Sequence, residues 1–432
     1  MRLLHTSDWH LGQNFMGKSR QAEHQQLIDW LVVQVDIHDV DAVLIAGDIF
    51  DTGTPPSYAR ELYSQLVVRL HAAGVTLLLL GGNHDSVATL RESSALLEQL
   101  SAHVVPAADE PASQVRVLPL RTRRANAGER GSAHAHDSGR AAATPGCVVC
   151  AVPFIRPRDV IQSESGQSAE QKQQSLRLAI EAYYRAVHAA AEDTRKQLSA
   201  QPGRKVPLIA TGHLTTVGAS TSESVREIYV GALDAFPTSA FPSVDYLALG
   251  HIHRPQKVGG HEHIRYSGSP IALSFDEATQ QKEVLLVELG EAGLEAVTPL
   301  PVPVFQPLVA LKGNLKSLPD AFARIAQAAR DATPQRPVWL EVIVAEDDYL
   351  ADLPARIQAM TEGQPLEVLR IRRERGNAVA QLCGEAGITL DELDPLDVFA
   401  RRLAHETLDD DVRAALTERY KRVLAAAVEG EA

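Results

Sequence analysis

The sequence predicts an α/β fold that is followed by a smaller α+β domain and a helical tail. From residue 1 to about 290, short apolar runs alternate with segments of helical period, which is the pattern of α/β proteins. A proline-rich stretch at 298–307 separates this part from a shorter one. After about 390 come two segments with apolar residues at helical spacing, which are too short to form a domain.

The first part contains eight expected strands and four expected helices. The strands are Arg2–Thr6, Ala42–Ala46, Val75–Leu80, Val115–Leu118, Val148–Val152, Leu208–Thr211, Tyr246–Leu249 and Val284–Leu289. Helices are expected near 21–38, 56–73, 87–100 and 170–198, and the last has no proline or glycine. Residues 121–146, rich in Ala, Gly, Arg and Ser, interrupt two strands and are expected to form a flexible insertion.

The shorter part reads as helix–strand–helix–strand. Its segments are "LPDAFARIAQAAR", "VWLEVIVAED", "LADLPARIQAM" and "LEVLRIRRER". We therefore expect a main domain at 1–297, a small domain at 305–380 and a helical tail at 390–429. Amphipathic helices of this length suit docking onto a partner.

Composition narrows the class of protein. Of the 432 residues, 45% are hydrophobic and 22% are charged, which is ordinary for a soluble globular protein. No apolar run reaches the ~18–20 residues of a membrane span, and the N-terminal segment lacks the features of a signal peptide. The sequence therefore predicts a cytoplasmic protein with no membrane association.

Charge and cysteine usage exclude further classes. A net charge of −13 argues against a nucleic-acid coat protein. It does not exclude a nuclease with local basic patches, such as "RTRR" (121–124) and "RIRRER" (370–375), although such runs are more often solvated faces. Cys147 and Cys150 lie three residues apart in a strand pattern, so they would point to opposite faces and are expected to be structural.

Five predicted strands end in side chains that bind metals. These side chains are Asp8 and His10, then Asp48, then Asn83, His84 and Asp85, then His213, and finally His251 and His253. The carboxyl ends of adjacent strands meet in one crevice, where α/β sheets bind their ligands. Gly47, Gly82, Gly212 and Gly250 precede them and would allow tight turns and close backbone approach.

The set suits two divalent ions. Asp48 would bridge both ions with its two carboxylate oxygens, Asp8, His10 and His253 would complete one, and Asn83, His213 and His251 the other. Mixed imidazole and oxygen ligands favour Mn²⁺, Fe²⁺ or Zn²⁺ over Mg²⁺. Two ions about 3.5–4 Å apart can clamp a phosphoryl group and activate water. One such histidine alone would more often be structural, but five matching strand ends are hard to obtain by chance.

These motifs resemble those of the calcineurin-like metallophosphoesterases. D-x-H, G-D-x-x-D, G-N-H-D, G-H and G-H-x-H occur in this order over residues 8–253. The stretches "HTSDWHLG", "AGDIFD", "GGNHDS" and "VPFIRPRD" are similar to those of the SbcD family, the nuclease subunits of bacterial SbcCD complexes. The resemblance covers nearly the whole chain. It implies a two-sheet sandwich flanked by helices, a DNA-facing cap domain and a tail that binds the coiled-coil ATPase SbcC.

The resemblance also implies an activity and an assembly. The activity is that of an ATP-dependent double-strand 3′→5′ exonuclease and single-strand endonuclease, acting on DNA ends and hairpins in DNA replication, recombination and repair, with Mn²⁺ as cofactor. The assembly is a homodimer within a heterotetramer with SbcC, built through the helices near 56–73 and 87–100. The insertion at 121–146 departs from the shorter loop of the family, but no motif residue lies there.

His84 is expected to be catalytic and not a metal ligand. Consecutive side chains diverge in a strand-end turn, so His84 would face the substrate phosphate if Asn83 faces the metals. An imidazole titrates near neutrality and can act as a general acid. The alternative is a residue that orients Asn83 or Asp85.

Two other functions remain open. The first is a small-molecule or protein phosphoesterase on the same fold, against which the cap domain and the tail argue. The second is a catalytically inactive scaffold, against which the complete set of ligands argues.

Overall fold

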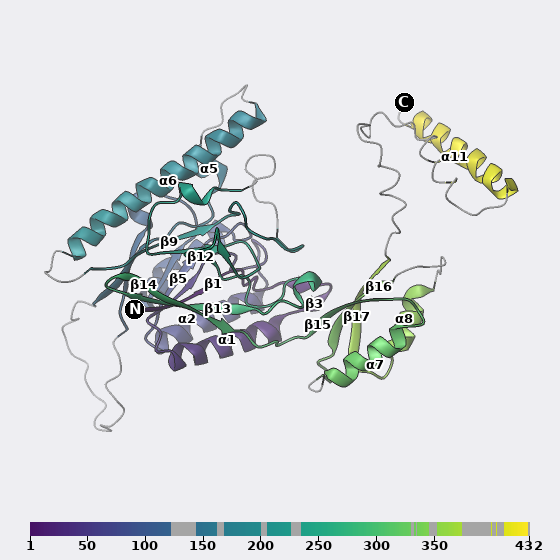
Figure 1. Cartoon of the computed structure of the whole chain (residues 1–432), viewed down its shortest axis with the longest axis horizontal. Coiled ribbons are helices and arrows are strands. Elements are labelled where there is room, and N and C mark those ends of the chain that lie inside the picture. Colours follow the sequence, from purple (N-terminus) through teal and green to yellow (C-terminus); the bar gives the residue numbers. More distant parts are fainter. Residues whose placement is uncertain are drawn as a thin grey trace. The chain divides into compact units, whose positions relative to one another are not determined.

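The computed structural model describes residues 1–121, 144–161, 168–199, 205–225, 235–329, 332–333, 335–344, 352–373, 399, 403 and 410–430. The chain divides into two compact units, Met1–Ala310 with Thr333–Trp339, and Leu311–Ala332 with Leu340–Ala432. Figure 1 labels the elements of both units. Within the described ranges, no helix is both long enough and apolar enough to cross a membrane.

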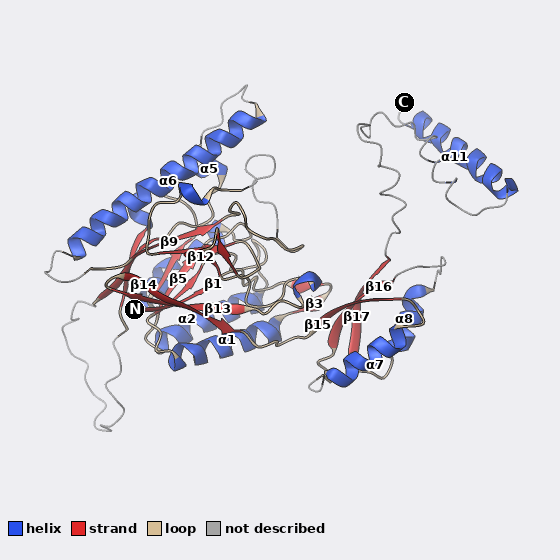
Figure 2. Cartoon of the chain, in the orientation of Figure 1, coloured by secondary structure: helices blue, strands red, loops and turns tan. Residues whose placement is uncertain are grey.

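The first six-stranded sheet of the first unit has the order β14-β13-β1-β4-β5-β6. Figure 2 draws the strands in red and the helices in blue. Its strands are β1 (Arg2–Thr6), β4 (Ala42–Ile45), β5 (Thr76–Leu80), β6 (Ala102–Val105), β13 (Glu283–Gly290) and β14 (Gly293–Pro301). β1, β4, β5 and β6 are parallel, whereas β13 runs antiparallel to β1 and β14 antiparallel to β13. Helices α1 (Gln21–Ile37) and α2 (Ser57–Ala72) make two of the crossovers that parallel pairing requires.

The second six-stranded sheet has the order β11-β12-β10-β9-β8-β7. Its strands are β7 (Val115–Pro119), β8 (Pro145–Cys150), β9 (Leu208–His213), β10 (Tyr246–Gly250), β11 (Gln256–Val258) and β12 (His261–Tyr266). β8, β9, β10 and β12 are parallel, and the two edge strands are antiparallel to their neighbours. The long helix α6 (Ala169–Leu198) lies in the connection from β8 to β9.

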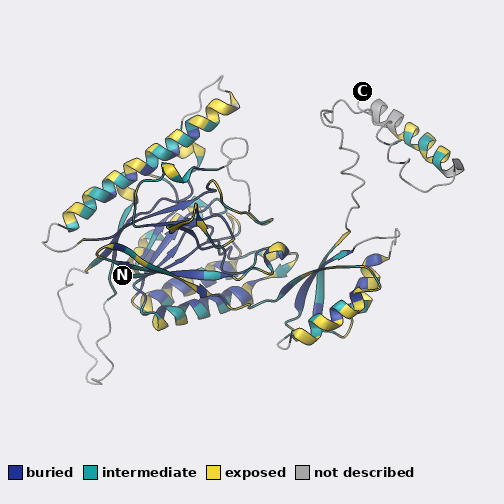
Figure 3. Cartoon of the chain, viewed as in Figure 1, coloured by how far each residue is buried: buried dark blue, intermediate teal, exposed yellow. Residues whose placement is uncertain are grey.

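Three clusters of buried apolar side chains hold the layers together. Leu27 of α1 and Leu77 of β5 belong to the cluster on the outer face of the first sheet. Leu44 and Ile209, one from each sheet, belong to the cluster between the sheets. Tyr184 of α6 belongs to the cluster that covers the second sheet. Figure 3 shows the central strands of the two large sheets buried and the outer sides of α1 and α6 exposed. The first unit is therefore a two-sheet sandwich flanked by helices, as predicted.

Short elements complete the first unit. They are β2 (Asn14–Phe15), β3 (Lys18–Ser19), α3 (Val87–Arg91), α4 (Ser94–Gln99), α5 (Pro157–Val160) and the 3₁₀ turns Pro111–Gln114, Thr238–Ala240 and Phe275–Glu277. The helix predicted at 87–100 is thus divided between α3 and α4. Two adjacent serines, Ser93 and Ser94, stand at the division, and serine competes with the helix for backbone hydrogen bonds.

The prediction of a proline-rich link at 298–307 is wrong in its first part. Residues 298–301 belong to β14, where Pro301 pairs with Glu283. Proline is tolerated there because β14 is the edge strand of its sheet. All eight predicted strands are present, whereas β6, β11, β12 and β14 were not predicted.

A three-stranded sheet has the order β15-β16-β17, with strands β15 (Leu308–Gly313), β16 (Val338–Val344) and β17 (Leu366–Arg373). Helices α7 (Leu318–Ala328) and α8 (Leu353–Thr361) stand at the two predicted helical positions, and α7 buries Leu318 and Phe322. Of these five elements, the sequence did not predict β15.

The tail contains α11 (Asp410–Gly430). The aromatic ring of Phe399 stacks on that of Tyr420 with 3.9 Å between ring centroids. Most of the first predicted tail helix, and residues 122–143 of the predicted insertion with His134 and His136, lie outside the described residues.

Candidate metal centre

The predicted ligands converge at the carboxyl ends of the strands of both sheets. Asp8 and His10 follow β1, Asp48 follows β4, Asn83 follows β5, His213 ends β9, and His251 and His253 follow β10. Together with His84, which was predicted to be catalytic and not a ligand, they form three groups whose potential ligand atoms all lie within 4.8 Å of one another: Asp8, His10 and His253; His10, Asp48 and His84; and Asp48, His213 and His251. The Asn83 amide oxygen lies 2.9 Å from His213 Nε2 and 3.2 Å from His251 Nδ1.

Asp48 stands at the middle of this arrangement. Its Oδ2 lies 3.2 Å from His213 Nε2 and 3.7 Å from His10 Nε2. The same carboxylate oxygen is therefore close to one histidine of each predicted ion site. Its Oδ1 accepts a hydrogen bond of 2.9 Å from the backbone N–H of His84. The two oxygens are thus held in different directions.

All but one of the predicted ligands are buried. The six charged or imidazole residues at the predicted ligand positions are at most 2% exposed: Asp8, His10, Asp48, His213, His251 and His253. Asn83 and His84 are only half-buried. A substrate would therefore approach from the side of Asn83 and His84.

Backbone strain is concentrated at the centre. Asp8, His10, Asp48 and His251 have positive φ angles of 55°, 49°, 51° and 91°. This region is unfavourable for residues other than glycine, and it persists only where the surrounding structure imposes it. Here Asp8 N–H donates to the Gly47 carbonyl, and His251 N–H donates to the Asp8 carboxylate, each at 3.0 Å. The strand-end turns are thus fixed by residues of the centre itself.

Two glycines make room for the ligands. A Cβ atom on Gly47, whose φ is 97°, would lie 2.1 Å from His213 Nδ1. A Cβ atom on Gly82 would lie 2.1 Å from Asp48 Oδ1. Both distances are far below van der Waals contact, so these positions exclude every larger residue, in agreement with the close approach expected from the sequence.

A further ring of side chains holds the predicted ligands, and it was only partly predictable. Asp51 Oδ1 lies 3.1 Å from His10 Nδ1, and the Asp85 carboxylate accepts backbone N–H groups from Gly82, Ile49 and Phe50 at 2.9–3.1 Å. Asp51 is the last residue of the G-D-x-x-D motif, and Asp85 is the last residue of the G-N-H-D motif. Glu277, whose Oε1 lies 3.3 Å from His253 Nδ1, stands in "SFDEAT", which contains no signal of this kind.

The protein groups set the charge of the centre. Burial opposes ionisation of Asp48, but His213, His10 and His84 hold its pKa well below the usual range. Burial lowers the pKa of His213, but Asp48 and Asp8 outweigh this effect and raise it to about 9. Burial and the neighbouring His213 hold the pKa of His251 well below its usual value. At neutral pH these protein groups by themselves give an ionised Asp48 carboxylate, a cationic His213 and a neutral His251 imidazole.

Divalent metal ions fit these residues. His10 Nε2 and His251 Nε2 are buried and have no hydrogen-bond partner among the described residues. An unpaired buried polar atom is costly and calls for a partner. Imidazole nitrogens together with carboxylate and amide oxygens are the donors that divalent transition metals take.

The other motifs noted in the sequence do not join this centre. Cys147 belongs to the cluster between the sheets, and Cys150 belongs to the cluster that covers the second sheet. Burial raises the pKa of each thiol to about 12, as expected for structural cysteines. His261 and His263 lie on the separate strand β12, with 5.5 Å between ring centroids.

Three described arginines of the two basic runs form ion pairs. Arg370 and Arg372 both form ion pairs with Glu341, which is 3% exposed. Arg121 pairs with Asp36 at 3.4 Å. These contacts favour the solvated or structural interpretation for these three arginines, whereas residues 122–124 and 374–375 lie outside the described residues.

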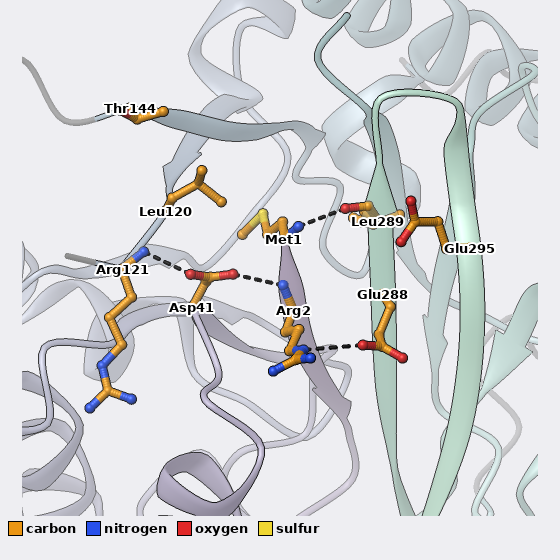
Figure 4. Close-up of a pocket in the computed structure, with 9 residues that line it drawn as sticks. All are labelled: Met1, Arg2, Asp41, Leu120, Arg121, Thr144, Glu288, Leu289 and Glu295. Carbon is orange, nitrogen blue, oxygen red and sulfur yellow. Dashed lines mark hydrogen bonds and ion pairs between the residues drawn. The ribbon is translucent and has the colours of Figure 1, made fainter. Parts of the chain in front are cut away.

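A cavity of about 560 Å³ lies at the other end of the strands. Its walls include Arg2, Asp41, Arg121, Glu288 and Glu295 (Figure 4). The Asp41 carboxylate accepts hydrogen bonds from the backbone N–H groups of Arg2 and Arg121, at 2.7 and 2.8 Å. The charges of this cavity are mixed, Arg2 is paired with Glu288, and no metal-binding group was found in it among the described residues. The metal centre is therefore the better candidate for catalysis.

Comparison with known proteins agrees with this geometry. The family model described as "Calcineurin-like phosphoesterase" matches residues 1–255, and the one described as "Type 5 capsule protein repressor C-terminal domain" matches residues 304–407. A relative from Escherichia coli (strain K12), which is named as the SbcD chain of the nuclease SbcCD, is 48% identical over 98% of each chain. The chain belongs to the SbcD family of calcineurin-like phosphoesterases.

Other SbcD relatives are more distant. One from Rhodobacter capsulatus is 33% identical over 85% of this chain and 86% of its own. One from Bacillus subtilis is 29% identical over 68% of each. Membership of the phosphoesterase family implies a hydrolase that works with divalent metal ions, which agrees with the groups of ligand atoms found here.

Proposed function

We propose that the chain is a DNA nuclease with two metal ions. In complex with the ATPase SbcC it would act as an ATP-dependent 3′→5′ exonuclease on double strands and as an endonuclease on single strands and hairpins. The observation that carries this proposal is the convergence of seven ligands at one edge of the sandwich, in a chain that matches a relative named as part of a nuclease over 98% of its length.

The seven ligands would be shared between the two ions. Asp48 would bridge both ions, Asp8, His10 and His253 would hold one, and Asn83, His213 and His251 the other. Bound ions would polarise the phosphodiester and supply a hydroxide nucleophile at neutral pH. Mn²⁺ suits this mixture of imidazole and oxygen donors better than Mg²⁺ does.

His84 would act on the substrate from the open side. Its Nδ1 lies 2.8 Å from the Asp51 carbonyl oxygen, and a carbonyl only accepts, so Nδ1 carries a hydrogen. Because Nδ1 is engaged in this hydrogen bond, Nε2 is the ring nitrogen that can transfer a proton to the substrate. The His84 ring stands edge-on to that of His10, with 4.6 Å between centroids. We assign His84 the protonation of the departing ribose oxygen, or a hydrogen bond to the phosphoryl group as charge builds up.

Cleavage of a hairpin DNA tests the function. The chain loaded with Mn²⁺ should open the hairpin, and adding SbcC and ATP should extend cleavage to double-stranded ends. A chain that hydrolyses a small phosphodiester but no DNA would favour the small-molecule phosphoesterase instead. A chain that binds Mn²⁺ and hydrolyses neither substrate would favour the inactive scaffold.

The partner proposal rests on the tail. Leu416 and Val423 on α11 are 38% and 59% exposed, and a separation of seven residues places them on one face of the helix. We propose that this face binds SbcC. A homodimer within the heterotetramer would use α2 and α4, where Val68 and Leu96 are 55% and 65% exposed.

Deleting the tail from about residue 390 should abolish stable association with SbcC. The described part of the deleted segment adds no strand to either large sheet, so the metal centre should remain intact. We expect residual metal-dependent cleavage of single strands, measured alongside co-purification with SbcC. A full-length chain with Leu416→Lys and Val423→Lys should lose SbcC in the same way. Co-purification of the truncated chain with SbcC would contradict the assignment.

A further inference from the structure

A buried ion pair lies directly behind His253. Lys282 Nζ is 2.7 Å from Glu277 Oε2, and the two residues are 6% and 0% exposed. Lys282 Nζ also donates to the carbonyl oxygen of His253 at 2.9 Å and to Ser269 Oγ at 3.0 Å. A buried pair of this kind is costly unless its remaining hydrogen-bonding capacity is used. Here Lys282 uses its remaining N–H groups to hold the backbone of His253, a predicted ligand.

The Glu277 carboxylate gathers donors on both of its oxygens. Oε2 accepts from the backbone N–H of Leu273 at 3.0 Å in addition to Lys282. Oε1 accepts from Ser222 Oγ at 2.7 Å and from Ser224 Oγ. The carboxylate therefore joins the segment that follows β9 to the turn after β12.

The same contacts fix the hydrogen on the His253 ring. His253 Nδ1 lies 2.6 Å from Ser224 Oγ and 3.3 Å from Glu277 Oε1. Because Ser224 donates its own hydrogen to Glu277, its oxygen is left to accept one, and a carboxylate oxygen can only accept. Nδ1 must therefore carry a hydrogen. In a neutral imidazole the lone pair then lies on Nε2.

We propose that Glu277, held by Lys282, is a positioning residue that presents Nε2 of His253 to the metal ion. This inference rests on the proposed role of His253 as a metal ligand. Metal-binding histidines commonly donate their second N–H to a carboxylate, and loss of that partner typically lowers metal affinity 10–100-fold. Ser224 extends the reach of Glu277 to the ring.

Ser222 and Ser224 provide a matched pair of variants. Both hydroxyls donate to Glu277, but only Ser224 Oγ also contacts the His253 ring. Ser224→Ala should weaken binding of one Mn²⁺ ion and leave the other unchanged in a calorimetric titration. Ser222→Ala, which removes a hydroxyl 3.1 Å from Ser224 Oγ that does not contact the ring, should lose less affinity than Ser224→Ala. Equal affinities in wild type and Ser224→Ala would overturn the proposal that Ser224 links Glu277 to the His253 ring.

The role of Glu277 itself is tested by removing both charges together. Glu277→Gln alone would leave Lys282 buried without its counter-ion, so the double variant with Lys282→Met is used. It should keep a melting temperature close to that of the wild type and lose about 10–100-fold in affinity for one ion. Wild-type affinity for both ions in this variant would overturn the proposal.

The tautomer gives a readout besides metal binding. In protein labelled with ¹⁵N-histidine, the ring of His253 should show hydrogen at Nδ1 in the wild type and a mixture of tautomers in the double variant. An unchanged tautomer would overturn the positioning role. A wild-type chain that binds fewer than two ions would instead overturn the proposed metal centre, and the two failures are therefore distinguishable.

Discussion

Asp48→Asn should weaken binding of both metal ions and abolish nuclease activity. Asn keeps the shape of the side chain but loses the negative charge between the two groups of histidines, from which Asp48 Oδ2 is 3.2 and 3.7 Å distant. A neutral amide cannot offer an anionic oxygen between two cations. The loss of affinity should exceed the ~10–100-fold that removal of an outer partner costs.

Metal analysis after dialysis, together with calorimetric titration of Mn²⁺, measures this loss directly. Asp51→Asn is the matched control, because Asp51 contacts His10 Nδ1 at 3.1 Å but is not a member of any of the three groups of ligand atoms. It should lose affinity moderately and at one ion. An Asp48→Asn chain that retains two tightly bound ions and full activity would contradict the bridging role.

His84→Ala should leave both metal ions bound while cleavage falls by roughly 10²–10⁴-fold, the usual contribution of a positioned acid. The ring is held by the Asp51 carbonyl and stands on the half-buried side of the centre, where a substrate can reach it. Its backbone N–H, which supports Asp48 Oδ1 at 2.9 Å, is retained in the variant.

Single-turnover cleavage and metal content should be measured on the same preparation. His71→Ala removes an exposed histidine in the last turn of α2 and should cleave DNA at the wild-type rate. A His84→Ala chain that loses metal in proportion to activity would show instead that His84 orients the ligands. A substrate with a good leaving group should be less affected, since it needs no proton.

The sequence predicted those strands in which every residue is buried. Strands such as Thr76–Leu80, in which every residue is buried, stand out as apolar runs, and their carboxyl ends locate Asp48 and Asn83 without further information. The residues of β11 and β12 are partly exposed and more polar, so their pattern did not distinguish them from loops.

The outer partners of the ligands were predictable only where a motif contains them. Asp51 and Asp85 stand within three residues of a ligand, because a turn that presents one side chain also places its neighbours. Glu277 reaches His253 from 24 residues away, through a 3₁₀ turn whose sequence resembles any polar loop. Such contacts depend on how loops pack, and hydrophobic periodicity carries no information about that packing.

The pairing of β1 with β13 has a consequence for synthesis of the chain on the ribosome. Asp8 and His10 follow β1, yet β1 is completed by β13, in which Glu288 pairs with Arg2. Contacts this distant in sequence form late and slowly. The first motif to be translated therefore waits for nearly the whole first unit before its ligands are held in place. In an unfinished chain that ends before β13 we therefore expect no assembled centre, so the hydrolase should stay inactive until the ribosome has passed residue 290.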